Sequence, residues 1–263
     1  GNDYVAIAAG NAHSLALKQD GSIVGWGSDV DGAATPPPGN DYVAIAAGNR
    51  CGLALKSNGS VVTWGYINTP PAGESYVAIA AEDDHCLALK SDGTIVGWGD
   101  NHDGQATPPQ GSDFLAIAAG GRHSLALRSD GSIAGWGQNS QGQATPPDGN
   151  DFVAIAAGEN HSLALKSDGS IIGWGSNYDD LFTLPDGNDF VAIAPGLAIR
   201  RDGSIVSWVN WPYASLTPPP GNDFVAISTG FFQHVALRDT CRYRIEGDLN
   251  NDCRVDFCDF CMM

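Results

Sequence analysis

The chain has 263 residues, of which 43% are apolar and 16% are charged, and its formal net charge is −17 at pH 7. This composition is typical of a globular protein with a large core and excludes a disordered chain. The excess of acidic side chains argues against nucleic acid as a partner, because nucleic-acid binding depends on Lys and Arg that displace counterions. No apolar run approaches the roughly 18 residues of a membrane-spanning helix, so we expect no membrane insertion.

A unit that opens with Tyr or Phe recurs along the chain. It starts seven times, at Tyr4, Tyr42, Tyr76, Phe114, Phe152, Phe190 and Phe224. The first six units also carry a Trp at an equivalent place, and successive Trp residues are 34 or 38 positions apart. Self-similarity at this period predicts a solenoid or a propeller.

Each unit contains three predicted strands, which the fifth unit illustrates in chain order. FVAIAAG (152–158), HSLALKS (161–167) and SIIGWG (170–175) are short runs rich in Val, Ile, Leu and Trp that stop at turn-forming residues. Asp168-Gly169 predicts a tight hairpin turn between the second strand and the third. The segment QATPP, at 105–109 and 143–147, predicts a fourth strand at the blade edge, where the missing N–H of proline costs least.

The first strand of the unit is apolar on both faces. In the fifth unit, Val153 and Ile155 are expected to point to one face, and Phe152 and Ala154 to the other. Burial on both sides is expected of a blade wedged between two neighbours around an axis. The alternative, a two-layer sandwich, explains neither the period nor the two-sided burial.

The recurring pattern AAGxxHSLALxxDGxIxGWGxNxxGQ resembles the regulator of chromosome condensation repeat family, in a short form similar to the secreted propeller-type β-lactamase inhibitor. WD-type repeats have a similar length, but here Gly follows the Trp and His opens the second strand. The resemblance covers residues 1–239 and implies an all-β, seven-bladed propeller of 34–38-residue repeats. We expect the seventh blade to be incomplete or to be closed by the termini.

Residues that repeat in most units are interpreted as parts of the scaffold, because a catalytic group is needed only once or twice. We assign one equivalent position to His13, His85, His123, His161 and His234 and expect these side chains to bridge strands by hydrogen bonds to the backbone. The repeated Trp residues are expected to fill the blade interfaces. Cys51 replaces the His of unit two and Cys86 lies one place after the His of unit three, which leaves an inter-blade disulfide or two separate buried thiols open.

Departures from the repeat are where a function specific to this chain would lie. The chain direction puts the AAG loops and the loops after the Trp-Gly strand on one face, and the Asp-Gly turns and PPxGND connectors on the other. We call these the loop face and the connector face. The loop face varies and gains aromatic side chains, which suit a protein-binding hot spot. The candidate partner-binding residues are Tyr66, Tyr178, Asp179, Asp180, Phe182, Trp211, Tyr213, Phe231 and Phe232.

Two deletions predict hollows on the loop face. The segment after Trp64 is four residues short, and the segment at Pro195 lacks four residues including the His. We therefore expect a notch beside blade two and another beside blade six. Drift in surface loops is the alternative explanation for the variation.

The C-terminal residues 240–263 depart from the repeat and predict a short irregular or helical tail. GDLNNDCRVDFCDF spaces oxygen ligands as an EF-hand loop does, and it resembles the first half of a dockerin, the calcium-dependent module that docks exported proteins onto cohesins. The resemblance implies Ca²⁺ ligands at Asp248, Asn250, Asp252, Asp256 and Asp259, with the backbone carbonyl of Arg254. Cys253 occupies the usual Gly position, and the second copy of the motif is absent.

These patterns together favour a non-enzymatic, monomeric propeller that is secreted or held at the cell surface. Six cysteines, four of them in the tail, favour an oxidising setting. The expected partner is a protein or a surface glycan, with a cohesin-like partner for the tail. The alternatives are an inhibitor of a β-lactamase or penicillin-binding enzyme, a polysaccharide-active enzyme with its site at the axial funnel, and a spacer in a surface assembly.

Overall fold

The computed structural model describes residues 3–67, 69–73, 75–176, 183–208, 210–211, 214–215, 217–230, 233–239 and 255–261. The strands are β1 Tyr4–Ala9, β2 His13–Lys18, β3 Ile23–Gly27, β4 Tyr42–Ala47, β5 Cys51–Lys56, β6 Val61–Gly65, β7 Tyr76–Glu82, β8 His85–Lys90, β9 Ile95–Gly99, β10 Phe114–Ala119, β11 His123–Arg128, β12 Ile133–Gly137, β13 Phe152–Ala157, β14 His161–Lys166, β15 Ile171–Gly175, β16 Phe190–Ala194, β17 Leu197–Arg200, β18 Ile205–Ser207, β19 Asn210–Trp211, β20 Ala214–Ser215, β21 Phe224–Thr229, β22 Gln233–Asp239 and β23 Val255–Cys261. One 3₁₀ turn, η1, covers Val30–Gly32. The described residues contain no helix with the length and apolar character needed to cross a bilayer.

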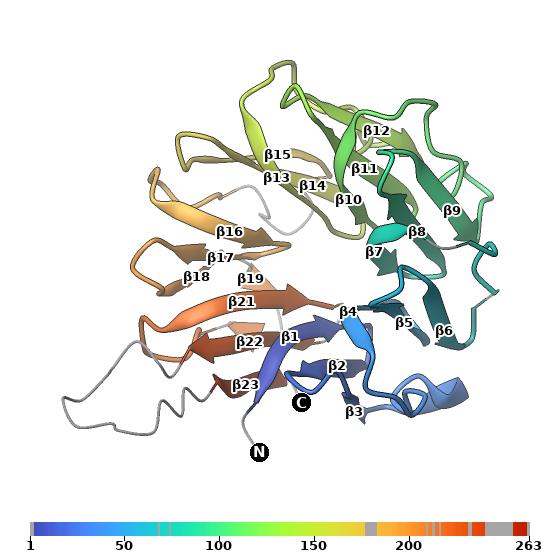
Figure 1. Ribbon diagram of the computed structural model, residues 1–263. Coiled ribbons are helices and arrows are strands. Elements are labelled where there is room, and N and C mark those ends of the chain that lie inside the picture. Colours follow the sequence, from blue (N-terminus) through green and yellow to red (C-terminus); the bar gives the residue numbers. More distant parts are fainter. Residues whose placement is uncertain are drawn as a thin grey trace.

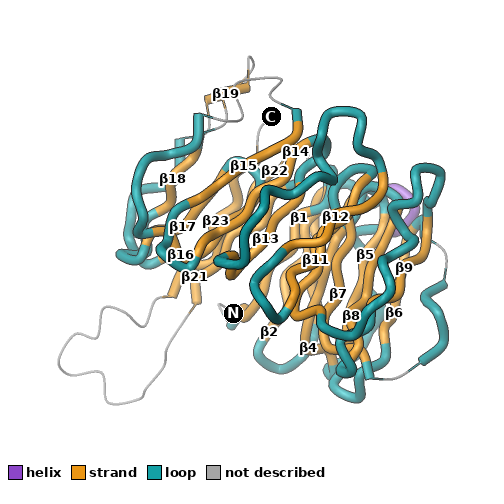
Figure 2. Tube along the Cα trace, turned by 90° about the horizontal axis from the view of Figure 1, so that it is seen from above, coloured by secondary structure: helices purple, strands orange, loops and turns teal. Residues whose placement is uncertain are grey.

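The sheets form a closed ring of seven blades, so the predicted seven-bladed propeller is confirmed (Figure 1). Each blade is a three-stranded antiparallel sheet whose strands follow one another in sequence, from β1–β3 in blade 1 to β21–β23 in blade 7. The first strands of successive blades contact one another, and β21 contacts β1 to close the ring. Figure 2 shows the same blades seen from above.

The predicted hairpin turns are present and identify the connector face. Gly169 has φ +87°, and a Cβ there would lie 2.2 Å from the carbonyl oxygen of Asn188 in the connector. The backbone N–H of Phe190, at the start of the next blade, donates to the carbonyl of Gly169 at 3.1 Å. Only Gly tolerates both the positive φ and the close approach, so the Asp-Gly turn determines where the next blade begins.

The core lies between blades, where side chains of adjacent sheets interlock. At the junction of blades 5 and 6, for example, Leu165, Phe190 and Ala198 form one buried cluster, and Trp208 packs against it. Full burial of one such large apolar side chain stabilises the fold by about 1.5–3 kcal/mol. The blades are therefore held mainly by apolar packing with their neighbours.

The predicted burial of the first strand on both faces is wrong at one position in each blade. The register of β13 against β14 shifts between Phe152 and Ala154, which makes Val153 a bulged residue. Its side chain is 52% exposed. A bulge leaves the extra residue outside the ladder, so Val153 and its counterparts face solvent although the strand pattern counts them as core.

The predicted fourth strand is also absent, because the QATPP segments carry no strand in the described chain. Two prolines remove the donors that a ladder would use. The segment instead crosses the third strand closely, since a Cβ on Gly97 would lie 2.4 Å from the carbonyl oxygen of Ala106. The carbonyl of Gln105 then accepts a hydrogen bond from Trp136 Nε1 of the next blade at 2.8 Å, so the segment joins blades.

Blade 7 is completed by residues from the C-terminal region, where we expected an irregular or helical tail. Strand β23, Val255–Cys261, pairs antiparallel with β22 along its whole length, from Asp239↔Val255 to Gln233↔Cys261. Without it, β22 would present a row of unpaired backbone groups to solvent. Residues 255–261, which the sequence pattern assigned to a separate tail, therefore form the third strand of blade 7.

Candidate binding cleft on the loop face

Two of the repeated histidines, His85 and His123, bridge neighbouring blades through a serine, as expected for scaffold residues. His123 Nε2 lies 2.8 Å from Ser162 Oγ of the next blade, and Ser162 Oγ donates to the carbonyl of Gln143 at 2.9 Å. Because the serine hydroxyl donates its proton to that carbonyl, it must accept from His123, so the hydrogen in the His123–Ser162 bond is on Nε2 of His123. The direct partner is thus a hydroxyl, which relays the contact to the backbone.

One histidine was assigned to the wrong position. The register places His234 opposite Thr229, where blade 1 has Ser14 opposite Ala9, so His234 occupies the Ser position. Gln233 takes the His position in blade 7 and donates from Nε2 to the backbone carbonyl of His13. An amide can replace an imidazole here because both extend an N–H donor to the adjacent blade.

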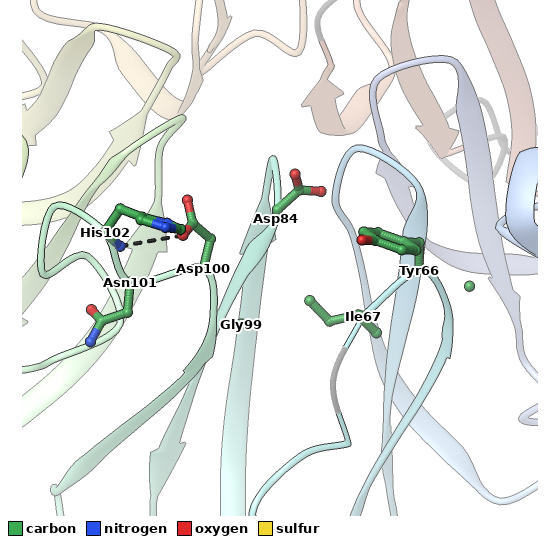
Figure 3. Close-up of a pocket in the computed structure, with 8 residues that line it drawn as sticks. Tyr66, Ile67, Asp84, Gly99, Asp100, Asn101 and His102 are labelled. Carbon is green, nitrogen blue, oxygen red and sulfur yellow. Dashed lines mark hydrogen bonds and ion pairs between the residues drawn. The ribbon is translucent and has the colours of Figure 1, made fainter.

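The expected notch beside blade 2 is present as a cleft of about 730 Å³ between blades 2 and 3. Its lining residues are Gly65, Tyr66, Ile67, Asp84, Gly99, Asp100, Asn101 and His102. The loop after the Trp-Gly strand and the loop before the His therefore share one face, as predicted. Figure 3 shows Tyr66 and Ile67 on one side of the cleft, Asp100, Asn101 and His102 on the other, and Asp84 between them.

The short loop after Trp64 opens this cleft. In blade 3, the corresponding loop supplies the buried Gln105, whose carbonyl accepts from Trp136. The loop of blade 2 is four residues shorter, and Ile67 packs against the apolar cluster of the junction. The Nε1 of Trp98 consequently has no hydrogen-bond partner among the described residues, although the atom is buried.

Tyr66 forms the aromatic wall of the cleft. Its side chain is 59% exposed, and the guanidinium of Arg50 lies 4.3 Å from the ring centroid. Arg50 is also paired with Asp31 at 3.1 Å. Stacking and the ion pair both restrain the ring from behind, which lowers the entropy lost when a partner contacts Tyr66.

The opposite wall is acidic. The carboxylate of Asp100 accepts from Gln105 Nε2 at 3.1 Å and from the ring and the backbone N–H of His102. The hydrogen bond from the His102 side chain lowers the pKa of Asp100, so this carboxylate stays ionised. Asp84 adds a carboxyl oxygen that is buried without a partner among the described residues.

A polar ladder joins the loops that precede the second strands of blades 1, 2 and 3. Asn11 Nδ2 donates to Asn49 at 2.9 Å, and Asn49 Nδ2 donates to Asp83 at 3.2 Å, so the chain of bonds crosses blades 1, 2 and 3. Burial raises the pKa of Asp83. Glu82, the next residue toward the axis, lies in the wall of an axial cavity of about 230 Å³ that is otherwise lined mostly by Ala and Ile.

Burial also raises the pKa of Glu82 to about 8, and the nearby carboxylates Asp83 and Glu159 add to the rise. This carboxyl therefore carries its proton over part of the physiological range, unlike Asp100. Negative charge in the region is concentrated at the cleft rather than at the axis.

Of the predicted partner-binding residues, only Tyr66 has a described side chain. Tyr178, Asp179, Asp180, Phe182, Tyr213, Phe231 and Phe232 lie outside the described residues. Trp211 is described only as part of the short hairpin formed by β19 and β20. The notch beside blade 6 therefore stays a prediction, and so do these contacts.

The calcium-loop residues Asp248, Asn250, Asp252 and Arg254 also lie outside the described residues. Asp256 and Asp259 lie in β23 with extended, paired backbone, opposite Arg238 and Val235. The described end of the motif thus takes a strand form instead of the curved loop that encloses Ca²⁺. Calcium binding by the tail stays a prediction.

Sequence reasoning missed most of the polar cleft residues. The variable loops of the loop face contain Asp84, Asp100, Asn101 and His102. The candidate binding residues were chosen mainly for their aromatic side chains, so these polar residues were left out. The deletion in the neighbouring blade was the stronger indicator, because it determines which variable loops border a hollow. Arg50 gave no separate indication, since its contact with Tyr66 depends on the three-dimensional packing of two loops.

Residues 4–33, 76–105, 114–143 and 152–180 match the family model of the regulator of chromosome condensation (RCC1) repeat. These segments make up less than half of the chain. Together with the seven-bladed ring, they define an RCC1-like β-propeller. No curated protein matches the sequence.

Solved propellers share the fold at low sequence identity. The CRINKLY WD40 ectodomain of the Arabidopsis thaliana receptor kinase ACR4 is 22% identical, with a TM-score of 0.76 over 89% of this chain and 90% of that one. The ectodomain of the Physcomitrella patens receptor kinase CR4 is 20% identical, with a TM-score of 0.75 over 91% of this chain and 71% of that one. Prp20p from Saccharomyces cerevisiae, described with its binding to Gsp1p and histones, is 22% identical, with a TM-score of 0.63 over 89% of this chain and 69% of that one.

Proposed function

We propose that this protein is a non-enzymatic binding propeller that holds a basic, extended segment of a partner protein in the cleft between blades 2 and 3. The observation that carries the proposal is the cleft itself, a hollow of about 730 Å³ made by one shortened loop and lined by an exposed Tyr and two Asp residues. An aromatic anchor beside carboxylates suits a Lys- or Arg-bearing chain.

The charges of the cleft support this choice of partner. Asp100 is held ionised by its hydrogen bonds, and the whole chain carries a net charge of −17. An acidic protein attracts a cationic segment at long range and repels phosphate-bearing surfaces. A protein segment is favoured over a neutral surface glycan because carboxylates recognise cations directly.

Unsatisfied groups at the junction add a second line of support. The Trp98 N–H has no partner among the described residues, and neither has one carboxyl oxygen of Asp84. In blades 4 and 5, the corresponding Trp donates to a carbonyl of the preceding blade. An acceptor that a bound segment brought to the Trp98 N–H would be worth about 1–3 kcal/mol, as for any buried donor.

The proposal includes an exported setting. Two of the similar structures are ectodomains of receptor kinases, and the chain carries six cysteines. These observations support export without depending on the cleft. A calcium-dependent tail with a cohesin-like partner is the alternative to the pairing of β23 with β22, and hydrogen exchange of residues 255–261 with and without calcium distinguishes the two.

The test compares partner capture by matched variants. Wild-type protein immobilised on a resin is exposed to the secreted fraction of its source, and bound proteins are quantified by mass spectrometry. Tyr66→Ala and Asp100→Asn should each lower capture of the specific partner at least about tenfold, the loss expected of a hot-spot residue. Asp168→Asn, which removes an exposed carboxylate on the connector face, should leave capture unchanged.

Salt provides an independent readout of the same contact. Capture should weaken as ionic strength rises from about 0.05 to 0.5 M, because exposed charge pairs are screened. Equal capture by all three variants, or capture that does not respond to salt, would reject the cleft as the binding site. Inhibition of a β-lactamase in a fluorogenic lactam assay, or hydrolysis of a polysaccharide, would favour the alternatives instead.

A further inference from the structure

At the junction between blades 2 and 3, both residues of one repeated inter-blade contact differ from the repeat. Between blades 4 and 5, His123 of one blade meets Ser162 of the next at 2.8 Å. At the junction of blades 2 and 3, the same two positions hold Cys51 and Cys86. Two different residue types have thus both become cysteine where their side chains meet.

Strand register establishes that the positions are equivalent. Cys51 pairs with the Gly that follows its blade's Trp, as His123 does. Cys86 pairs with the Trp of its own blade, as Ser162 does. Gly52, which replaces the Ser of blade 2, shows that a departure at this position does not require a cysteine.

The two thiols are in contact inside the protein. Cys51 and Cys86 are 1% and 0% exposed, belong to one apolar cluster with Leu53 and Trp98, and are free cysteines in this structure. A hydrogen bond from Cys86 lowers the pKa of the Cys51 thiol, whereas burial raises the pKa of Cys86. Cys51 is therefore the thiol of the pair that ionises more readily, and it is the better nucleophile.

We propose that Cys51 and Cys86 are the two halves of an inter-blade disulfide, which forms under oxidising conditions and staples blade 2 to blade 3 beneath the cleft. A disulfide needs the sulfur atoms to approach to about 2.05 Å, and thiols already in contact require only a small movement to reach it. The covalent bond takes the place of the His–Ser hydrogen bond found between blades 3 and 4 and between blades 4 and 5. This inference does not depend on the proposed partner.

The reaction is thiol–disulfide exchange with a low-molecular-weight disulfide such as oxidised glutathione. The Cys51 thiolate attacks one sulfur of glutathione disulfide, forms a mixed disulfide and releases one glutathione thiolate. The Cys86 thiolate then attacks the Cys51 sulfur and releases the second glutathione. The two protein thiols lose two electrons and two protons in total, and one glutathione disulfide becomes two glutathiones.

Burial determines when this reaction takes place. Neither sulfur is accessible in the folded ring, so the oxidant reaches Cys51 before blades 2 and 3 have packed together, or when that junction opens. We expect the bond to form efficiently during folding in a redox buffer and slowly when oxidant is added to folded, reduced protein.

Peptide mapping tests the bond directly on the full chain. The protein is refolded from denaturant in a reduced and oxidised glutathione buffer, alkylated without reductant and digested with trypsin. Cleavage after Arg50, Lys56 and Lys90 gives peptides 51–56 and 57–90, each with one cysteine. The expected product is a single species in which these two peptides are linked, and reduction should release both.

Matched variants separate this bond from the four tail cysteines. The disulfide closes a loop of about 35 residues and should raise the Tm of the oxidised wild-type protein over the reduced form by about 5–10 °C. The double variant C51H/C86S restores the His–Ser pair found between blades 3 and 4 and between blades 4 and 5, and it keeps every tail cysteine. It should fold and should show no such redox-dependent rise, and Cys86→Ser alone should also lose the rise.

Three results would overturn the proposal. The first is separate alkyl labels on peptides 51–56 and 57–90 after oxidative refolding. The second is linkage of either peptide to a tail cysteine. The third is an equal redox-dependent Tm shift in wild type and the double variant. Because none of these readouts involves a partner, they leave the proposed function of the cleft untouched.

Discussion

The histidine that opens the second strand acts as a neutral contact between blades, and its protonation state therefore affects stability. Burial lowers the pKa of His85 to about 4 and of His123 to about 3, from an ordinary value of 6.5. The unfolded chain thus takes up protons at these sites before the folded one does. Stability from these sites is complete above pH 6.5 and is lost as pH falls toward 4.

Replacing His123 by Gln should reduce this loss. Gln233 occupies the same position in blade 7, so the amide fits the site, and it does not titrate. We expect the Tm of His123→Gln to lie within a few degrees of wild type at pH 7. At pH 4.5 the variant should be less destabilised than wild type by about 1–3 kcal/mol. Thermal unfolding followed by circular dichroism across this range measures the effect, and parallel curves for the two proteins would contradict it.

Glu82 has the opposite pH dependence. Its pKa is raised from 4.5 to about 8, mainly by burial, so the folded state holds the proton more tightly than the unfolded state does. Stability should therefore decrease as pH rises from 4.5 to 8, with the full penalty above pH 8. The other six blades have Gly at this place, so the carboxyl is not needed for the ring.

Glu82→Gln should remove this alkaline penalty. We expect the variant to have a Tm several degrees above wild type at pH 8.5 and nearly the same Tm at pH 5, where the wild-type carboxyl is also neutral. The connector-face variant Asp168→Asn, at a carboxyl whose pKa is lowered by the side-chain hydrogen bond from Ser170, should give no gain at pH 8.5. A gain of equal size for Glu82→Gln at both pH values would show that charge is not the cause.

At the scale of the element, β23 has two competing descriptions. The spacing of Asp256 and Asp259 suggests the end of a calcium loop, but the structure pairs these residues with β22. A strand and a loop around a cation cannot both form from the same backbone. Blade 7 gains a full ladder from the strand, which explains why local ligand spacing alone did not determine the structure of this segment.

Removal of the chain after Asp239 should therefore destabilise blade 7. The truncated protein would expose β22 as an edge strand, and we expect a lower Tm and concentration-dependent association, measured by light scattering. Hydrogen exchange of residues 255–261 provides the complementary measurement. Protection with or without calcium is expected for β23, whereas protection that appears only with calcium would favour the loop.

At the scale of the whole molecule, the repeat determines the architecture and predicts most of it. The period, the Asp-Gly turns and the two faces of the ring are all present in the structure, because each depends on local residues that recur. The notch beside blade 2 was also predictable, since a deletion in one copy can be measured against the others. Repetition acts as an internal reference for both the scaffold and the site.

The features that sequence reasoning did not predict depend on how strands and loops pair in three dimensions, within a blade or between blades. Val153 is exposed because of a bulge, which hydrophobic pattern alone does not reveal. His234 was shifted by one place because its neighbour Gln233 performs the histidine's role through a contact with blade 1. The walls of the cleft come from two blades, so their polar residues became apparent only when the loops were placed side by side.

Ring closure is the property of the whole molecule that can be tested through one residue. Blade 1 is built from the N-terminal strands and blade 7 from the C-terminal ones, so no strand is shared across their junction. Gln233 Nε2 contacts the carbonyls of Gly10 and His13, and the N–H of Ala9 donates to Ser228 Oγ at 3.0 Å.

Gln233→Leu keeps the size of the side chain and removes its donor, so blade 7 loses its contacts with the carbonyls of Gly10 and His13. The His13 carbonyl still accepts from the Gly10 N–H at 2.8 Å. Loss of one such contact costs about 1–3 kcal/mol, which corresponds to a fall in Tm of about 3–8 °C. Because the joint is the only junction changed, hydrogen exchange should accelerate first in β1 and β22, while blades 3 to 5 keep wild-type protection. Uniform acceleration around the ring would instead mean that the blades unfold as one unit and that closure has no separate contribution.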